Sequence, residues 1–385
     1  MEPLATQLAE MQAVVAEAID AGAAGLASSF APTHQGIDGK PIPSRFAASA
    51  EIEGLMQVVG DAGRGVIEVT PGENLGFDTM YDLQRRLGVP MTYTALLAIA
   101  GLWPTLSELN DKETDAGANV WPQVSPRPLT MQVQMSDPFQ FNQAPCFAEL
   151  IAEGPEVRRE RYADPAWRER AVGELGSIAL APRWETFEVA ESEAHPDLIG
   201  RSVADLAAER GGHPLDVMCE LSLEEDLATR YRSVLANDDE EGIEYLLASR
   251  HVVLGLSDAG AHVGQLCDAP LPTDFLGNWV RDRDVLPLEA GVRKLTGEPA
   301  DLFGFEGRGY LAEGACADIT VFDPDTVAPG PVRRVWDFPA GADRLTADQP
   351  TGIAHVLVNG TPIQVDGESL ATTMADRPGR LVRPA

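Results

Sequence analysis

The 385-residue sequence has few cysteines, few basic residues and no long apolar run. Its cysteines, Cys146, Cys219, Cys267 and Cys316, form no C-x-x-C pair, which argues against a zinc ribbon or a disulfide scaffold and favours a reducing cytoplasm. No apolar stretch reaches the roughly 18 to 20 residues that a transmembrane helix requires. The sequence therefore predicts a soluble, cytoplasmic protein that does not act at a membrane.

Basic residues are outnumbered two to one by acidic ones. Lys and Arg total 29 against 60 Asp and Glu, which gives a formal net charge of −31. A field of this sign repels nucleic acid and anionic membranes, so neither is expected as a partner. The 44% of hydrophobic residues is nevertheless enough to bury a sizeable core.

Short apolar runs alternate with amphipathic helical segments along most of the chain. The predicted strands lie within residues 24–30, 65–71, 89–100, 117–126 and 251–258. The predicted helices lie within residues 4–21, 50–62, 74–88 and 106–116. Because a parallel strand pair needs a crossover helix, this order predicts an α/β fold with a parallel sheet.

Two segments depart from the alternation. More than a hundred residues separate the fourth and fifth strands, and helical patterns around 201–211 and 222–250 predict a helical insertion over about 140–250 that covers the mouth of the sheet. Near the end, period-two alternation surrounds an Asn-Gly turn, which predicts a small β module. We therefore expect a β/α portion over 1–304 and a β portion over 305–385.

Candidate functional residues follow the predicted strands, because catalytic groups lie in the loops after the carboxyl ends of parallel strands. Asp258 in "GLSDAGAH" is a candidate proton-transfer group, and an Asx turn that caps the strand is the alternative. His262, four residues later, is either a substrate contact or a structural loop histidine. His34 and Arg45 follow the first strand and are candidates for positioning substrate, although a plain loop histidine is the alternative for His34.

Other polar groups near these strands support weaker interpretations. Glu68, Thr70 and Glu73 lie at the end of the second strand and are either solvated or available to a cation or a substrate amine. Ser257 suggests a G-x-S-x-G nucleophile elbow, but Ala259 replaces the last glycine and two prolines follow where a helix should begin. The elbow interpretation is therefore disfavoured.

Four phrases in the second half of the chain resemble one known family. "GLSDAGAH", "TGEPADLFG", "GYLAEGACAD" and "VLVNG" occur in the order and spacing of the metal-dependent amidohydrolase superfamily, specifically its N-acyl-D-amino-acid deacylase (D-aminoacylase) branch. The resemblance implies a partial (β/α)8 TIM-like barrel with a β-sandwich. The predicted strands would be barrel strands 4 to 8, and the carboxyl-terminal module would be part of the sandwich.

The resemblance also implies an activity. In this family a metal-held water attacks an amide carbonyl, and Asp258 matches the residue that shuttles the proton to the leaving nitrogen. The expected substrate is a small N-acyl amino acid or related amide, and the expected cofactor is a divalent metal, zinc. The alternative is a catalytically impaired remnant or subunit that keeps the scaffold for ligand or partner binding.

Metal ligands are where the sequence departs from the family pattern. The phrases "EVTPGEN" and "TYTALL" stand where the family has ligand histidines, and no H-x-H pair or ligand cysteine of an amino-terminal third precedes Met1. The metal ligands in this chain are therefore unknown. We expect a truncated chain, a barrel completed by another polypeptide, or a remodelled fold, and hence an oligomer or a missing amino-terminal complement.

Overall fold

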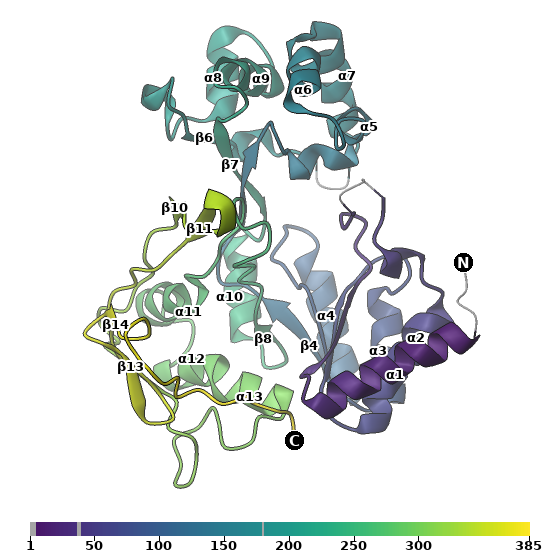
Figure 1. Ribbon diagram of the computed structural model, residues 1–385, viewed down its shortest axis with the longest axis vertical. Helices are drawn as coiled ribbons and strands as arrows, with labels where there is room; N and C mark the ends of the chain where they lie inside the picture. The colour runs from purple at the N-terminus through teal and green to yellow at the C-terminus, as the bar shows by residue number, and fades with distance from the viewer. Residues whose placement is uncertain (1–4, 37–39, 179–180) are drawn as a thin grey trace.

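The computed structural model describes residues 5–36, 40–178 and 181–385, and its main body is a parallel sheet flanked by helices (Figure 1). Within these ranges the sheet has the strand order β1-β2-β3-β4-β8, and every neighbouring pair is parallel. Each predicted apolar run contains one of its strands, so the predicted α/β fold with a parallel sheet is confirmed. The strands are β1 (Gly25–Ser29), β2 (Val66–Thr70), β3 (Met91–Tyr93), β4 (Val120–Val124) and β8 (Val253–Leu254).

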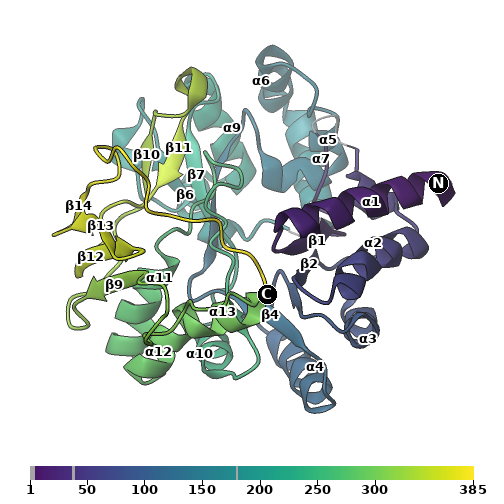
Figure 2. The same cartoon turned by 60° about the horizontal axis from the view of Figure 1, so that its bottom comes forward.

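Helices connect these strands in the order that parallel pairing requires. One helix precedes β1, one lies between each pair of strands up to β4, and another leads into β8. Figure 2 shows the first of these helices beside the sheet, on the side opposite the carboxyl-terminal strands. The helices are α1 (Ala5–Ala21), α2 (Ser49–Ala62), α3 (Phe77–Leu87), α4 (Trp103–Asp115) and α10 (Glu240–Ala248).

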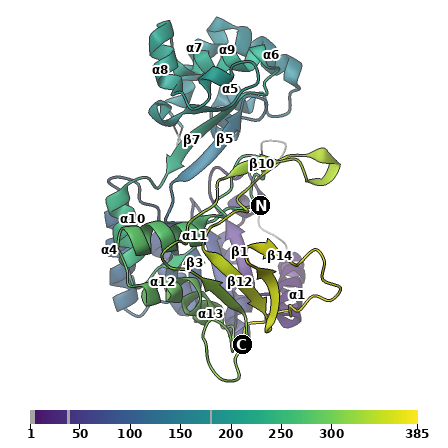
Figure 3. The ribbon, with the colours of Figure 1, turned by 90° about the vertical axis from the view of Figure 1, so that its left-hand side faces the viewer.

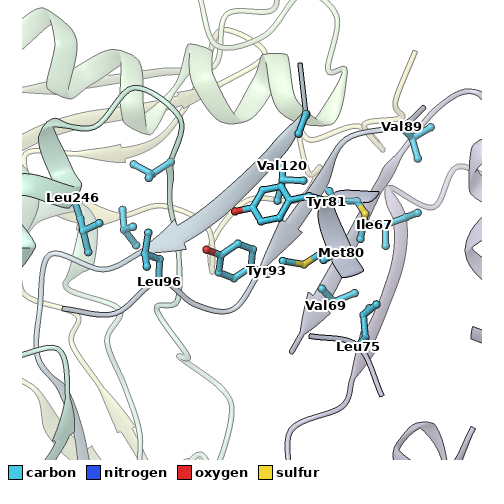
Figure 4. Packing of buried hydrophobic residues seen from close by; sticks show 14 of the residues in the cluster. Ile67, Val69, Leu75, Met80, Tyr81, Val89, Tyr93, Leu96, Val120 and Leu246 are labelled. Atoms are coloured by element: carbon cyan, nitrogen blue, oxygen red, sulfur yellow. The ribbon is translucent and has the colours of Figure 1, made fainter. Parts of the chain in front are cut away.

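The main hydrophobic core lies between the sheet and its helices. Ile67 and Tyr93 on adjacent strands are fully buried and belong to the same apolar cluster as Met80 of α3 (Figure 4). Burial of each such side chain contributes roughly 1.5 to 3 kcal/mol. Tyr81 adds a directional contact, because its buried hydroxyl donates to Asn110 Oδ1 of α4 at 2.9 Å. This packing fixes the strands whose carboxyl ends carry the candidate site.

The segment between β4 and α10 forms a second unit with its own core. It contains an antiparallel sheet in the order β5-β7-β6, and Figure 3 shows β5 and β7 rising from the main body to a group of helices. Phe141, Phe147, Tyr162 and Trp167 are buried together in this unit. Its elements are β5 (Leu129–Gln134), α5 (Pro145–Ala148), α6 (Pro155–Ala163), α7 (Pro165–Leu175), β6 (Glu188–Glu191), α8 (Val203–Arg210), α9 (Pro214–Glu224) and β7 (Arg230–Ala236).

The predicted helical insertion is therefore helical only in part. The pattern around 201–211 is the helix α8, but 222–250 contains the end of α9, the strand β7 and α10. Along β7 the buried Tyr231 and Ser233 alternate with the exposed Arg232, which is the period of a strand. Pairing with β5 selects this period over the helical one. The domain boundaries proposed from the sequence stay a prediction.

The end of the chain forms the predicted small β module. Within the described residues its main sheet has the order β14-β13-β12-β9. Asn359 and Gly360 join β12 to β13 with φ values of +48° and +75°, as a tight hairpin turn requires. The elements are β9 (Ile319–Phe322), β12 (Ile353–Val358), β13 (Thr361–Val365) and β14 (Glu368–Ser369), with a separate hairpin of β10 (Arg333–Val335) and β11 (Arg344–Thr346).

Three further helices lie between β8 and this module: α11 (Leu271–Asp274), α12 (Leu288–Leu295) and α13 (Gly297–Phe303). A helix of π type, Phe275–Asp282, directly follows α11. Among the described residues, no helix combines the length and the apolarity needed to cross a membrane.

Candidate active site

The candidate site lies at the carboxyl edge of the parallel sheet. Because parallel strands end at the same edge, the loops after β1 and β8 converge there. The first loop carries His34 and Arg45, and the second carries Asp258 and His262. These are the residues that the sequence singled out.

The loop after β1 is folded back onto the end of its strand. The Ser29 hydroxyl and His34 Nδ1 share a hydrogen bond of 2.5 Å. Ser44 Oγ donates to the Ser29 carbonyl at 2.6 Å, and Arg45 Nη1 donates to the His34 carbonyl at 3.2 Å. Asn74, from the loop after β2, donates to the Arg45 carbonyl at 2.8 Å. His34 and Arg45 are thus held against each other by backbone and side-chain contacts.

The electrostatic surroundings of His34 connect it to the second loop. Partial burial lowers the pKa of His34 below its usual value. The nearby His262 and Arg45 lower this pKa further, whereas the Asp258 carboxylate raises it. Arg45, Asp258 and His262 therefore each lie within electrostatic range of His34. The structure brings the predicted residues together, while the role of each stays a prediction.

Asp258 lies in a tight turn directly after β8. Its φ is +46°, in the left-handed region that Asp tolerates better than most residues. The Ala261 amide donates to the Asp258 carbonyl at 3.1 Å, and the Asp268 amide donates to the Ser257 carbonyl at 2.8 Å. Both bonds end on backbone carbonyls, whereas an Asx turn uses the side-chain oxygen. The Asx-turn and catalytic interpretations both stay predictions, and the Asp258 side chain is half-buried.

The loop after Asp258, residues 258–268, is held from two sides. On one side the Gln132 amide of β5 donates to the Gln265 carbonyl at 2.8 Å, and on the other the Leu345 amide of β11 donates to the Val263 carbonyl at 2.7 Å. His262 packs against Phe139 of the insertion, with 4.1 Å between the ring centroids. The insertion and the carboxyl-terminal hairpin therefore position the candidate catalytic turn.

A buried arginine on β10 reinforces this arrangement. The side chain of Arg334 is 4% exposed, and its Nη1 donates to the Gly264 carbonyl at 2.9 Å. Its Nε donates to both carboxylate oxygens of Glu191, at 2.8 and 3.0 Å, and Nη1 also contacts Asp343. Arg230 of β7 binds the same Asp343 carboxylate at 3.0 Å. Two arginines and two acids thus join the insertion, the hairpin and the loop 258–268.

Strands β2 and β3 contribute a carboxylate–hydroxyl pair at the same edge. Thr94 Oγ1 donates to Glu68 Oε1 at 2.6 Å. Burial raises the pKa of Glu68 above its usual value, and the hydrogen bond from Thr94 opposes that rise. Glu68 is therefore not the fully solvated loop residue that one interpretation of the sequence suggested.

One ion-pair cluster after β4 was not identified from the sequence. Arg127 contacts Asp268 through Nε and Asp274 through Nη1, the latter at 3.0 Å. Asn237 Nδ2 holds this segment by donating to the carbonyls of Ser125 and Arg127 at 2.9 and 2.7 Å. The sequence could have revealed this cluster through Arg127 itself, because an arginine shortly after a buried parallel strand places a cation at the edge of the site.

A cavity of about 400 Å³ opens beside His262, between the loop after β1 and the insertion. Thr33 and Gln35 line it on the sheet side. Asn142 and Arg158 line it on the side of the insertion. The cavity is thus continuous with the candidate site through His262.

A resident metal would require a specific set of ligands at this site. Catalytic zinc sites take three protein ligands from His, Cys, Asp or Glu. In the described part of the chain, no group of three or more such side chains is arranged to hold a metal ion. The donor set of these residues therefore does not fit the expected metal.

A comparison with protein-family models decides the family. The amidohydrolase family model matches residues 6–364, which is most of the chain. The chain belongs to the amidohydrolase family. The resemblance seen in the sequence is thus confirmed, including the D-aminoacylase-like branch, since the relatives below fall within it.

Two relatives with named activities belong to this branch. The chain is 26% identical over 386 residues to an N-acyl-D-glutamate deacylase of Alcaligenes xylosoxydans xylosoxydans, covering 99% of this chain and 65% of that protein. A D-aminoacylase of the same organism is 35% identical over 178 residues, 44% of this chain and 31% of the relative. The chain therefore spans about 65% of the length of the first of these relatives.

Solved structures of the same family share the fold. A crystal structure of D-aminoacylase superposes with a TM-score of 0.61 at 22% identity, covering 99% of this chain and 67% of that one. The N-acyl-D-glutamate deacylase of Bordetella bronchiseptica, complexed with zinc and a phosphonate inhibitor, superposes with a TM-score of 0.58 at 23% identity, covering 96% and 66%.

Proposed function

We propose that the protein is a hydrolase of carbon–nitrogen bonds other than peptide bonds, acting on N-acyl-D-amino acids as its deacylase relatives do by name. The observation that carries the proposal is the position of Asp258. It follows the last strand of the parallel sheet, in the sequence phrase typical of the family, and its carboxylate acts electrostatically on His34. The loops after β1 and β8 therefore converge on Asp258, the proposed proton-transfer group.

The chemistry assigned to Asp258 is that of a general base and acid. Its carboxylate takes a proton from the water that attacks the amide carbonyl and delivers that proton to the leaving nitrogen. His34 and Arg45, as donors across the site, position the substrate, and His262 completes the wall next to the insertion. The lowered pKa of His34 keeps its ring neutral at pH 7, so it serves as a hydrogen-bonding group and not as a fixed cation.

The described residues do not supply a set of ligands for a metal. Related structures are described as having a binuclear metal centre or bound zinc. A divalent metal, zinc, stays a prediction from the family.

The lack of a three-donor group among the described residues also favours a second candidate function. A scaffold that keeps Asp258 and the loop contacts without a three-donor group fits a catalytically impaired subunit that binds a ligand or partner. The two candidates differ in a measurable way, because only the first requires turnover.

The deciding experiment is hydrolysis of N-acetyl-D-amino acids by purified protein, with metal content measured on the same sample. Under the first candidate, Asp258→Asn lowers kcat by about 100- to 10,000-fold, the usual contribution of a positioned acid–base group. The control is Asp115→Asn, which changes an exposed aspartate at the end of α4, near the amino-terminal end of β4, and should leave kcat unchanged. Absence of both turnover and stoichiometric metal supports the second candidate.

Several finer assignments belong to the same proposal. We infer that β1 to β4 and β8 correspond to strands 4 to 8 of a (β/α)8 barrel and that the carboxyl-terminal sheet is part of a β-sandwich. The cytoplasmic location and an oligomeric or complemented state also remain proposals. Free thiols at all four cysteines support the first, and the unpaired edges of the parallel sheet in the described part of the chain support the second.

A further inference from the structure

A hydroxyl and an imidazole form a close pair at the carboxyl end of β1. Ser29 is the last residue of that strand, and its Oγ lies 2.5 Å from Nδ1 of His34. The Ala31 amide donates to the same Oγ at 3.4 Å. Within the described residues, His34 Nδ1 is the only acceptor that the hydroxyl proton reaches. We therefore assign this proton to the bond between Ser29 and His34, and the ring hydrogen to Nε2.

The strand register turns this hydroxyl away from the main core. Because β1 and β2 pair in parallel, the side chain of Ser29 lies on the same face of the sheet as that of Glu68. Ile67 and Val69, on either side of Glu68, point the other way and belong to the core. Ser29 is half-buried, and the His34 ring keeps access to solvent. The pair is thus placed where a small molecule can reach it, at the edge that carries the candidate site.

Two charged groups surround the imidazole. The Asp258 carboxylate raises the pKa of His34, so it stabilises the imidazolium that forms when the ring takes a proton. Arg45 lies within electrostatic range of the same ring and can offset a negative charge that develops beside it. Thr33 and Gln35, the neighbours of His34 in the chain, line the cavity of about 400 Å³ at the candidate site. A hydroxyl, a base and an acid therefore lie together next to a space for a ligand.

We propose that Ser29 is a nucleophile that accepts acyl groups from esters, with His34 as its general base. A hydroxyl is activated in this way when a base lies within hydrogen-bond reach and a third group acts on that base. Esters are the expected class because an alcohol departs from carbon more readily than an amine does. The inference goes beyond the proposed function, since it gives the site a second activity that does not depend on amide hydrolysis.

The ester and water are the only reactants. The Ser29 oxygen attacks the ester carbonyl, and the hydroxyl proton moves to His34 Nδ1. The bond to the alcohol oxygen breaks, and His34 gives that proton to the departing alcohol. Water then attacks the acyl-serine while His34 takes a proton from it. The carboxylic acid leaves, and His34 returns the proton to Ser29.

A fluorophosphonate probe tests the nucleophile directly, because it bonds to activated serines: Oγ attacks phosphorus, fluoride leaves and the hydroxyl proton passes to the base. Mass spectrometry of the digested protein should find the probe on the Ser29 peptide of the wild type and not on that of Ser29→Ala. The matched control is Ser28→Ala. Ser28 precedes Ser29 on β1 and points to the opposite face, so this variant should be labelled at the wild-type rate.

The base is tested by the rate of labelling. His34→Asn should slow labelling of Ser29 by about 100- to 10,000-fold, the usual contribution of a positioned base. In the wild type the rate should rise with pH as His34 loses its proton, with a midpoint below 6.5, the usual pKa of histidine. Burial, His262 and Arg45 lower this pKa, and Asp258 opposes them. A purely structural bond between Ser29 and His34 would not produce such a profile.

Two outcomes overturn the inference: no probe on Ser29 in the wild type, or an unchanged labelling rate in His34→Asn. If Ser29→Ala does not fold, Ser29→Cys decides. Its new thiol should be alkylated by iodoacetamide more slowly when His34→Asn is added, and an unchanged rate overturns the inference as well. Failure of the proposed function looks different, because the wild type then hydrolyses p-nitrophenyl acetate through Ser29 but no N-acetyl-D-amino acid.

Discussion

At the scale of single residues, one guanidinium serves two carboxylates near the candidate turn. Arg127 contacts both Asp268 and Asp274. Burial raises the pKa of Asp268 to about 6, and the Asp274 charge adds to this rise while Arg127 opposes it. Because the Asp268 amide also closes the turn after Asp258, protonation here occurs next to the candidate catalytic group.

This shift predicts a pH dependence of stability. The pKa of Asp268 is higher in the folded chain than its usual 3.8, so folding takes up a proton between these values. The free energy of unfolding should therefore fall as pH rises from about 4 to 6.5, by on the order of 2 kcal/mol from this group. Urea unfolding of the wild type and Asp268→Asn at both pH values measures it.

In Asp268→Asn this part of the pH dependence should be absent, while Asp115→Asn on the exposed end of α4 should retain it. Any effect of losing the contact with Arg127 that does not depend on pH cancels when the free energies of unfolding at the two pH values are subtracted. Equal pH dependence in wild type and Asp268→Asn would contradict the assignment.

Some candidate residues could be identified from the sequence and others could not. The sequence identified Asp258, His262, His34 and Arg45, because each follows a recognisable strand and parallel strands bring such residues to one edge. The ion-pair partners of Arg127 could not be identified, because Asp268 and Asp274 lie 141 and 147 residues further along the chain. Such a contact arises only from tertiary packing.

At the scale of elements, the loop 258–268 depends on the hairpin β10–β11. Arg334 is the buried part of that contact, with bonds to Gly264, Glu191 and Asp343. Without Arg334, Glu191 and Asp343 keep only Arg230 as a counter-charge among the described residues. Because charged hydrogen bonds are lost, Arg334→Met should lower the free energy of unfolding by about 1.5 to 3 kcal/mol. Chemical denaturation measures this loss.

The adjacent arginine provides the control. Arg333 pairs with Asp348 at the surface, with its side chain 43% exposed, so Arg333→Met should cost less than about 1 kcal/mol. Hydrogen exchange tests the positioning role directly. The Leu345 and Gln132 amides, which donate to the loop, should exchange faster in Arg334→Met and at the wild-type rate in Arg333→Met. Similar stabilities for the two variants would refute the role of Arg334.

The sequence predicted elements where their signals were local. Apolar runs with intervening amphipathic helices identified every strand of the parallel sheet, and the Asn359–Gly360 pair identified the hairpin of β12 and β13. It missed β5 and β7, because the period-two pattern of β7 lies among residues that also fit a helix. Their pairing is antiparallel across about a hundred residues, and no local pattern encodes such a partner.

At the scale of the whole molecule, the parallel sheet has open ends. In the described residues β1 pairs only with β2, and β8 pairs only with β4. Exposed edges recruit further strands, so we predict self-association, with a mass above one chain by light scattering. The net charge of −31 opposes contact between copies, so association should increase with salt as the charges are screened.

A charge on the edge strand should reverse this association. Ala27 is exposed on β1, and Ala27→Lys should shift the protein toward a single chain. Val14→Lys, on the exposed face of α1, is the control and should not. A wild type that stays a monomer at all salt concentrations would contradict the prediction.

The contacts that hold the loop 258–268 also imply an order of events during synthesis. Asp258 leaves the ribosome well before Arg334 and Leu345, the residues that hold its loop from one side, and the nearer of these contacts spans 70 residues. The nascent chain thus carries the candidate catalytic group before it can fix its position. The candidate site becomes complete only as one of the last modules folds.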